Sequence, residues 1–114
     1  MAFQGMTAET AYGKALTYVK VNQSAAGTTE LAAAQAANKH KLIGAFLTMS
    51  VLGTLKLTDG VADLLGPVDL ATTSGFVAPP SPIPWTQTGA INRALNLITT
   101  LGAARGVVIV LTEP

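Results

Sequence analysis

KLIGAFLTMSVLGTLKLTDG, residues 41–60, is the stretch of sequence that decides the fold. Its apolar run from Leu42 to Leu55 is 14 residues long, and a membrane-spanning helix needs about 20. Apolar and small or polar side chains alternate along the run, which is the period of a β-strand. The two expected faces are Ile43, Ala45, Leu47, Met49 and Val51, against Leu42, Gly44, Phe46, Thr48 and Ser50. The stretch therefore predicts a strand.

The same alternation continues on both sides of this strand. Residues 54–58 predict a second strand with Leu55 and Leu57 on one face, and Asp59 with Gly60 predicts the turn after it. Residues 14–22 also alternate and are rich in Tyr, Val and Thr, which favour a pleated surface. Residues 28–37 are rich in Ala and have high helix propensity. Because this segment is short and lies between two β-rich segments, we expect a strand over 28–34, with a short helix as the alternative.

The second half of the chain predicts shorter strands. Gly66 and Pro67 place any strand within 61–70 at an edge or a bend. A brief strand is expected over 76–78, followed by an extended, proline-rich edge segment over 79–84, because proline has no N–H to donate to a sheet. Residues 89–99 alternate again, and Arg93 falls on their apolar face, so that face is expected to be partly solvated or paired. The continuous β-branched run 107–111 predicts burial on both faces.

These segments predict an all-β fold. About eight short strands separated by turn signals are typical of a jelly-roll-like antiparallel β-sandwich. We assign the sandwich to residues 14–114. Residues 1–13 lack a clear period. They are expected to form either a frayed terminus or an extended N-terminal arm that orders against a neighbour, and we assign them to the arm.

Composition narrows the classes of function. The chain has 114 residues, enough for one domain, and only 11% of them are charged, against about 25% in average soluble domains. The net charge is +1 without a basic stripe, and there is no cysteine. Nucleic-acid binding, disulfides and cysteine chemistry are therefore not expected. Without a basic, apolar leader at the start, we expect a soluble protein that is not secreted.

The sequence offers no catalytic or metal-binding pattern. His40 is interpreted as a solvated histidine in a turn over 38–40. Asp59 and Asp63 are expected to support turn geometry rather than a cation. Trp85 is interpreted as a plug at the mouth of the core, with a ligand-stacking platform as the alternative. We expect no enzyme activity, no cofactor and no metal.

Scarcity of charge points to an interaction surface instead. A small domain with so few ionic groups has to expose apolar area, and such area is typical of association. We predict a homo-oligomer with closed symmetry, for which a dimer is the general default. If Val107, Ile109 and Leu111 face the core, the opposite parity faces outward, and the predicted interface is Leu16, Tyr18, Val108 and Val110. The loop after the prolines supplies a second candidate contact, formed by Pro82, Ile83 and Trp85.

Several segments in order resemble a known family. They are TTELAAA (28–34), NKHKLIGAFL (38–47), TLKLTDG (54–60), LGPVDL (65–70), GFVAP (75–79), PIPW (82–85), ALNL (94–97) and GVVIV (106–110). Together they are similar to the small proteins that decorate or cement the heads of tailed bacteriophages. The resemblance covers roughly residues 25–113 and consists of strand and turn patterns without a catalytic signature. A similar pattern occurs in jelly-roll domains of head fibres and receptor-binding tips.

The resemblance implies a function as well as a fold. It implies a jelly-roll trimer bound to the outer surface of the virion, with the major capsid protein as partner, after synthesis in the host cytoplasm. It also implies that the N-terminal arm reaches a neighbouring capsid subunit, and the candidate residues of this arm are Phe3, Met6 and Tyr12. Nucleic acid, membrane and small-molecule substrates are not expected as partners. The alternative is a receptor- or carbohydrate-binding module of a fibre or tip.

Overall fold

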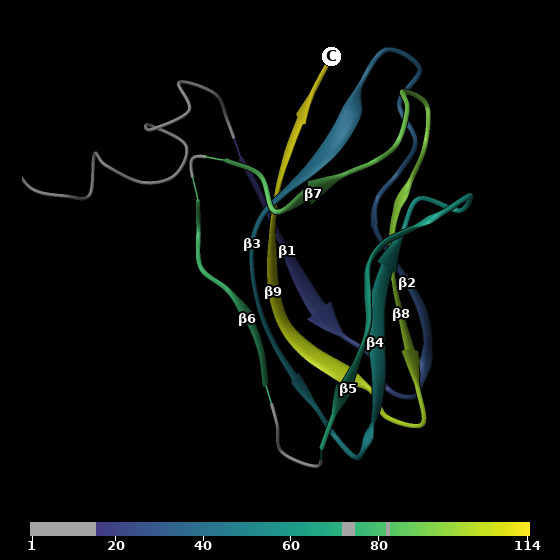
Figure 1. Ribbon diagram of the computed structural model, residues 1–114, viewed down its shortest axis with the longest axis vertical. Coiled ribbons are helices and arrows are strands. Elements are labelled where there is room, and N and C mark those ends of the chain that lie inside the picture. The colour runs from purple at the N-terminus through teal and green to yellow at the C-terminus, as the bar shows by residue number, and fades with distance from the viewer. Residues whose placement is uncertain (1–15, 72–74, 82) are drawn as a thin grey trace, which may run out of the picture.

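The computed structural model describes residues 16–71, 75–81 and 83–114, and they form two antiparallel β-sheets packed face to face (Figure 1). Sheet A contains, in spatial order, β1 (Thr17–Asn22), β9 (Ala104–Glu113), β3 (Lys39–Met49) and β6 (Gly75–Ala78), and β7 (Thr86–Gln87) also pairs with β3. Sheet B contains, in spatial order, β2 (Gly27–Ala32), β8 (Leu95–Thr100), β4 (Gly53–Thr58) and β5 (Asp63–Leu70).

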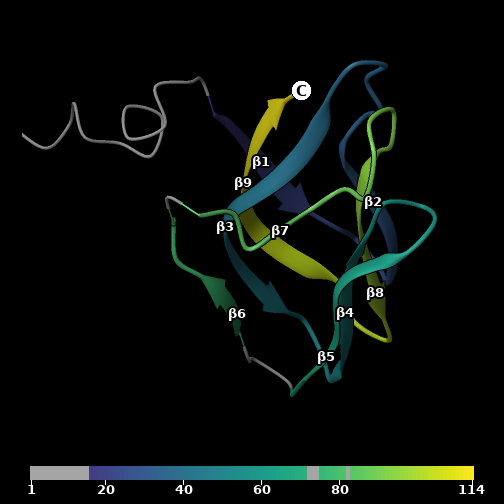
Figure 2. The same ribbon diagram turned by 45° about the horizontal axis from the view of Figure 1, so that its top comes forward.

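The strand order is that of a jelly roll. The chain passes repeatedly between the sheets, so that β1 pairs with β9 and β2 pairs with β8, joining the two ends of the described chain. Figure 2 shows the two layers side by side, with sheet A and sheet B labelled by their strands. This is the doubled Greek-key arrangement of two-sheet jelly rolls. The predicted all-β sandwich is confirmed. Among the described residues no helix is long and apolar enough to cross a membrane.

The core lies between the sheets. Leu55 and Leu57 on β4 pack against Leu95 and Leu97 on β8, and all four are almost completely buried. Full burial of a leucine contributes about 1.5–3 kcal/mol relative to exposure. The alternation predicted for residues 54–58 is therefore confirmed as the core face of sheet B.

A β-bulge changes the predicted faces of β3. The pairing of β3 with β9 shifts between Leu42 and Gly44, so Ile43 is the extra residue. Because a bulge moves the side chains beyond it to the other parity, Leu42 points into the main core together with Ala45 and Leu47. Ile43 belongs instead to a second cluster. The expectation that Ile43 shares the face of Ala45 is wrong for this reason.

Several predicted elements keep their identity but shift their bounds. The alanine-rich segment forms β2, which confirms the strand rather than the helix. The expected turn over 38–40 is wrong, since the turn lies at residues 36–37 and β3 begins at Lys39. β8 begins at Leu95, so the preceding residues, including the exposed Ile91, form a loop rather than the strand expected from 89.

The edges of both sheets follow the proline and glycine signals. β5 is the outer strand of sheet B, and its pairing with β4 is irregular around Gly66 and Pro67, which are joined by a cis peptide bond. Gly66 has a positive φ, and a Cβ there would lie 2.7 Å from the carbonyl oxygen of Leu55, so a larger residue would push the strands apart. β6 is the short outer strand of sheet A and leads into the proline segment, as predicted.

β9 is buried on both faces, as its continuous apolar run predicts. Val108 and Val110 point into the main core between the sheets. Ile109 and Leu111 lie on the opposite side of the strand, in the second cluster, together with Leu16. The expectation that Val108 and Val110 face outward is therefore wrong, because an unbroken run does not reveal which parity faces the other sheet.

Candidate binding surfaces

The outer face of sheet A carries exposed hydrophobic side chains. Phe46 on β3 lies directly between Val107 on β9 and Val77 on β6. Tyr18 on β1 lies opposite Ile109 on the same face. Tyr18, Phe46 and Val77 are 55%, 42% and 61% exposed. We call this group the outer-face row.

Only one of the four predicted interface residues is available at the surface. Tyr18 belongs to the outer-face row, whereas Leu16, Val108 and Val110 are buried. Phe46 and Val77 are not among the predicted interface residues, and the alternation places Phe46 on one face with Leu42, Gly44, Thr48 and Ser50. The turn and strand assignments alone do not reveal that this face is open to solvent.

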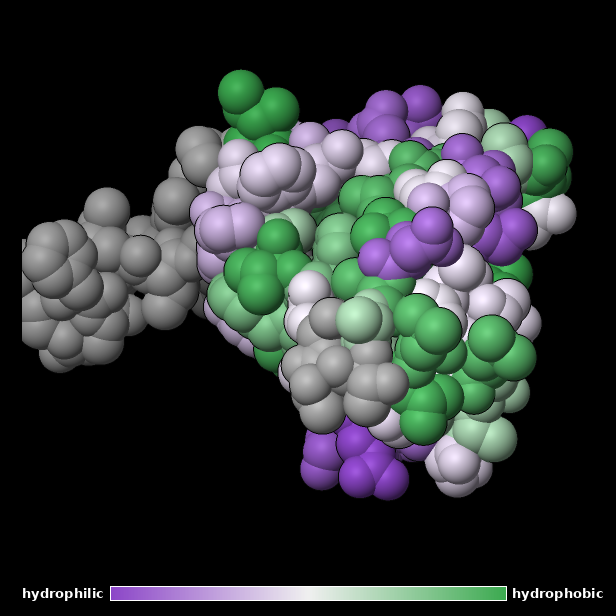
Figure 3. All heavy atoms as spheres, turned by 60° about the horizontal axis from the view of Figure 1, so that its bottom comes forward, coloured by the Kyte–Doolittle hydropathy of each residue, from purple (hydrophilic) through white to green (hydrophobic). Residues whose placement is uncertain are grey.

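One end of the sandwich presents a second apolar group. Ser50 at the end of β3 accepts a hydrogen bond from the backbone N–H of Ala103 through Oγ at 2.9 Å, and its own N–H donates to the Ala103 carbonyl at 2.9 Å. These bonds hold the β3–β4 and β8–β9 turns side by side. Val51, Leu52 and Leu101 are exposed there. Figure 3, in which this end comes forward, shows hydrophobic side chains gathered at its lower right.

Leu101 combines exposure with an unfavourable backbone. Its φ is +66°, and its side chain is 78% exposed. A leucine in the left-handed region is costly, and glycine or asparagine tolerates it better. Because a side chain this exposed buries little apolar area to offset the cost, Leu101 is the most conspicuous single residue of this end of the sandwich.

The predicted loop contact is partly described. Trp85 is half exposed, so the expectation that it plugs the core is wrong. Its indole Nε1 donates to the carbonyl of Pro79 at 2.8 Å, and its backbone N–H donates to Leu42 on β3 at 2.8 Å. The loop is thus anchored at the edge of sheet A. Ile83 is exposed beside it.

Four of the predicted site residues lie outside the described residues. They are Phe3, Met6, Tyr12 and Pro82.

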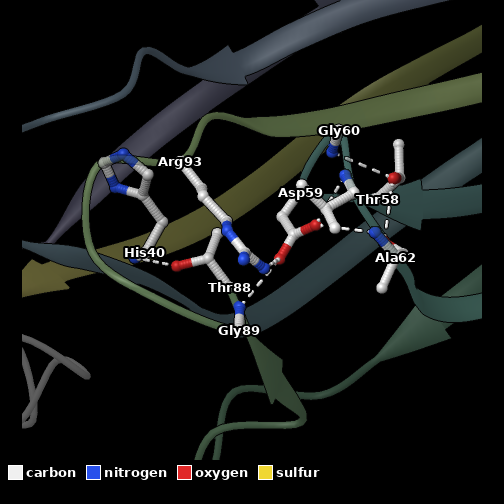
Figure 4. A network of polar contacts seen from close by, with 9 residues as sticks. His40, Thr58, Asp59, Gly60, Ala62, Thr88, Gly89 and Arg93 are labelled. Carbon is white, nitrogen blue, oxygen red and sulfur yellow. Dashed lines mark hydrogen bonds and ion pairs between the residues drawn. The ribbon is translucent and has the colours of Figure 1, made fainter.

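Asp59 is the centre of a buried polar network in the turn after β4 (Figure 4). One carboxylate oxygen accepts from the backbone N–H groups of Val61 and Ala62, both at 2.9 Å. The other accepts from the N–H of Gly89 at 2.8 Å and from Nη1 of Arg93 at 2.9 Å. The carboxylate has no exposed surface. Burial alone raises the pKa of Asp59, but these four hydrogen bonds outweigh it and hold the pKa well below its ordinary value.

This network holds the turn after β4 together. Thr58 adds two bonds, donating to the carbonyl of Ala62 at 2.9 Å and accepting from the N–H of Gly60 at 3.1 Å. Asp63 lies apart and pairs with Lys56 at 3.1 Å. Asp59 therefore supports the turn, as predicted, whereas Asp63 forms an ion pair with Lys56 of β4. The sequence pattern leaves open whether Arg93 is solvated or paired, and the structure pairs it with Asp59.

His40 is buried in the described fold, so its interpretation as a solvated turn residue is wrong. Its Nε2 lies 2.7 Å from the carbonyl oxygen of Ala33 and its Nδ1 lies 2.7 Å from Oγ1 of Thr112. A carbonyl can only accept, so these partners assign the ring hydrogen to Nε2. The backbone of His40 exchanges hydrogen bonds with Thr88. Both ring nitrogens therefore tie the β2–β3 loop to β9.

Gln23 is a structural residue that sequence reasoning missed. It is buried where β1 ends, and its Oε1 accepts from the Thr99 hydroxyl at 2.9 Å and from the N–H of Ala104 at 2.8 Å. Its Nε2 donates to Oγ1 of Thr29 at 2.9 Å. One side chain thus joins both sheets. Beside it, residues 22–29 line an open depression of about 310 Å³ with small and polar groups.

Among the described residues, every buried side-chain nitrogen and oxygen has a hydrogen-bond partner. In the same part of the chain, no group of three or more His, Asp or Glu residues is arranged to hold a metal ion. The features that stand out are therefore exposed apolar surfaces. No family model, curated protein or solved structure matches this chain.

Proposed function

We propose that this chain is a structural virion protein that binds the outer surface of a bacteriophage capsid as a trimer and cements neighbouring capsid subunits. The observation that carries this proposal is the exposure of ten large hydrophobic side chains among the described residues, on a chain with only 11% charged residues. Such surface on a small domain favours contact with other proteins. The jelly-roll order agrees with the proposal, because viral structural proteins commonly use this architecture.

The trimer would cement neighbouring capsid subunits through several weak contacts that are linked to one another. Each copy buries a modest area, and a trimer attaches through three such contacts at once. After the first contact forms, the others bind at high effective concentration, so release requires several contacts to break together. This mode needs neither a cofactor nor a catalytic residue.

The test compares capsid occupancy for the full chain and for a chain lacking residues 1–13. Capsids produced without this protein are mixed with each chain, sedimented and analysed for bound copies. The full chain is expected to bind and to raise the temperature at which the capsids open. The truncated chain is expected to bind at least about tenfold more weakly. A second variant, in which serine replaces Phe3, Met6 and Tyr12, is expected to show the same loss of capsid binding.

Two results would contradict this proposal. Absence of binding by the full chain would reject attachment to the capsid, and unchanged occupancy of both altered chains would reject the role of the arm.

Trp85 favours a second candidate function, recognition of a receptor or carbohydrate. Its indole N–H is already bonded to Pro79, so the half-exposed ring offers an apolar face rather than a donor. Sugars stack on such faces through their C–H groups. Binding to a glycan array that disappears in Trp85→Ala, with capsid occupancy unchanged, would support this function instead.

A further inference from the structure

The charged side chains of the described residues are divided between the two outer faces of the sandwich. The strand registers place four basic side chains and one carboxylate on the outside of sheet A: Lys20, Lys39, Lys41, Arg105 and Glu113. They place three carboxylates and one lysine on the outside of sheet B: Glu30, Asp63, Asp69 and Lys56. The remaining charged pair, Asp59 and Arg93, is bonded internally.

Local ion pairs leave this division intact. Glu113 is bound to Lys41 at 2.5 Å on sheet A, and Lys56 is bound to Asp63 at 3.1 Å on sheet B. Lys20 and Arg105 are exposed on the basic face, and Glu30 and Asp69 are exposed on the acidic face. The outside of sheet A is therefore net positive, and the outside of sheet B is net negative.

The two faces also differ in their apolar content. The outer-face row of sheet A presents Tyr18, Phe46 and Val77. Sheet B presents the half-buried Ile98, with Thr28 and Lys56 opposite it on the neighbouring strands. Apolar side chains in the middle and charges toward the rim are the usual composition of a protein interface.

We propose that the outside of sheet A in one copy packs on the outside of sheet B in the next copy. This inference rests on the self-association in the proposed function and assigns its two surfaces. A two-fold dimer through sheet A would bring basic faces together, and one through sheet B would bring acidic faces together. Both are opposed by like-charge repulsion. Head-to-tail packing joins opposite charges in a heterologous contact, which closes into a cyclic trimer when each copy is rotated by a third of a turn from the last and otherwise grows into an open filament.

Charge reversal on one face at a time tests the contact. Lys20→Glu with Arg105→Glu makes the outside of sheet A acidic, and Glu30→Lys with Asp69→Lys makes the outside of sheet B basic. Each double variant is expected to weaken self-association at least about 100-fold, because its two faces now repel. The quadruple variant, with both faces reversed, is expected to regain association to within about tenfold of wild type.

The measurement is sedimentation velocity at micromolar concentration. Wild type is expected to lose association between about 50 and 500 mM salt, because screening weakens the charged rim. The matched control, Ala25→Glu with Ala26→Glu, adds charge to the exposed β1–β2 turn, outside both faces, and is expected to behave as wild type. Circular dichroism checks that every variant is folded.

The outcomes separate this inference from the proposed function. A folded quadruple variant that stays dissociated, or double variants with the wild-type mass, would overturn the head-to-tail contact. A wild-type chain that is monomeric throughout would also overturn it, while capsid binding is measured independently. A single species of three copies supports both proposals. A ladder of growing species supports the contact and contradicts the trimer.

Discussion

Asp59 shows how one residue fixes a turn between two strands. Its carboxylate receives four hydrogen bonds, three from backbone N–H groups and one from Arg93. The partners come from the turn after β4 and from the loop before β8. The carboxylate therefore joins segments that the chain separates by about thirty residues, and the guanidinium of Arg93 balances its charge.

Replacing Asp59 with asparagine is expected to destabilise the fold by about 2–4 kcal/mol. The substitution leaves Arg93 without its counter-charge and places an amide N–H₂ among donors. Because the folded-state pKa of Asp59 is lowered, its stabilisation is present above the ordinary aspartate pKa, about 3.9, and is lost as the pH falls below it. Urea unfolding at pH 7 and pH 3 measures both effects.

The matched control is Asp69→Asn, at an exposed carboxylate on β5. It is expected to change the free energy of unfolding by less than about 0.5 kcal/mol. The wild-type protein should lose more stability between pH 7 and pH 3 than Asp59→Asn does. Equal losses in both proteins would contradict the role assigned to the carboxylate.

Replacement of Leu101, in contrast, is expected to increase the stability of the fold. Asparagine tolerates the left-handed backbone at φ +66° better than leucine does, and little buried area is lost at a residue that is mostly exposed. Leu101→Asn is expected to stabilise the fold by about 0.5–1 kcal/mol, measured by thermal unfolding. Leu52→Asn, in the neighbouring turn without positive φ, should give no gain. A destabilised Leu101→Asn variant would show that the side chain contributes to packing.

At the scale of a strand, two adjacent residues of β3 have different roles, one in the core and one on the outer surface. Leu47 faces the main core, whereas Phe46 faces outward in the outer-face row. Leu47→Ala is expected to cost about 2–5 kcal/mol of stability. Phe46→Ala is expected to cost less than about 1 kcal/mol but to weaken self-association about tenfold. Urea unfolding and sedimentation measure the two effects, and a large loss of stability in Phe46→Ala would contradict the assigned faces.

Strands were predictable to the extent that their period was unbroken. β4 follows a simple alternation, and its core face was predicted correctly. β3 has the same alternation, but the bulge at Ile43 inverts the face of Leu42, and no single residue announces a bulge. β9 has no alternation within its apolar run. Its burial on both faces was therefore predictable, whereas the side on which Val108 lies was not.

Hydrogen bonds between residues far apart in the sequence could not be predicted from the sequence pattern. Gln23 bonds to Ala104 across 81 residues, and His40 bonds to Thr112 across 72. Both residues are polar and stand next to turn signals, so local reasoning assigns them to solvent. Their burial depends on the pairing of β1 and β3 with β9, which closes only in the complete sandwich. Among the described residues, exposure at the surface could be predicted only where the sequence showed both which side chains share a strand face and which of the two faces is buried.

For the whole molecule, the two proposals predict that capsid attachment depends on self-association. A monomer keeps one capsid contact and loses the effective concentration that linked copies provide. The Lys20→Glu and Arg105→Glu variant is therefore expected to bind capsids about 100-fold more weakly than wild type, as measured by co-sedimentation. The quadruple variant with both faces reversed should recover most of this binding, because it associates again. Equal capsid binding by the dissociated variant would mean that each copy attaches alone and that cementing does not require the trimer.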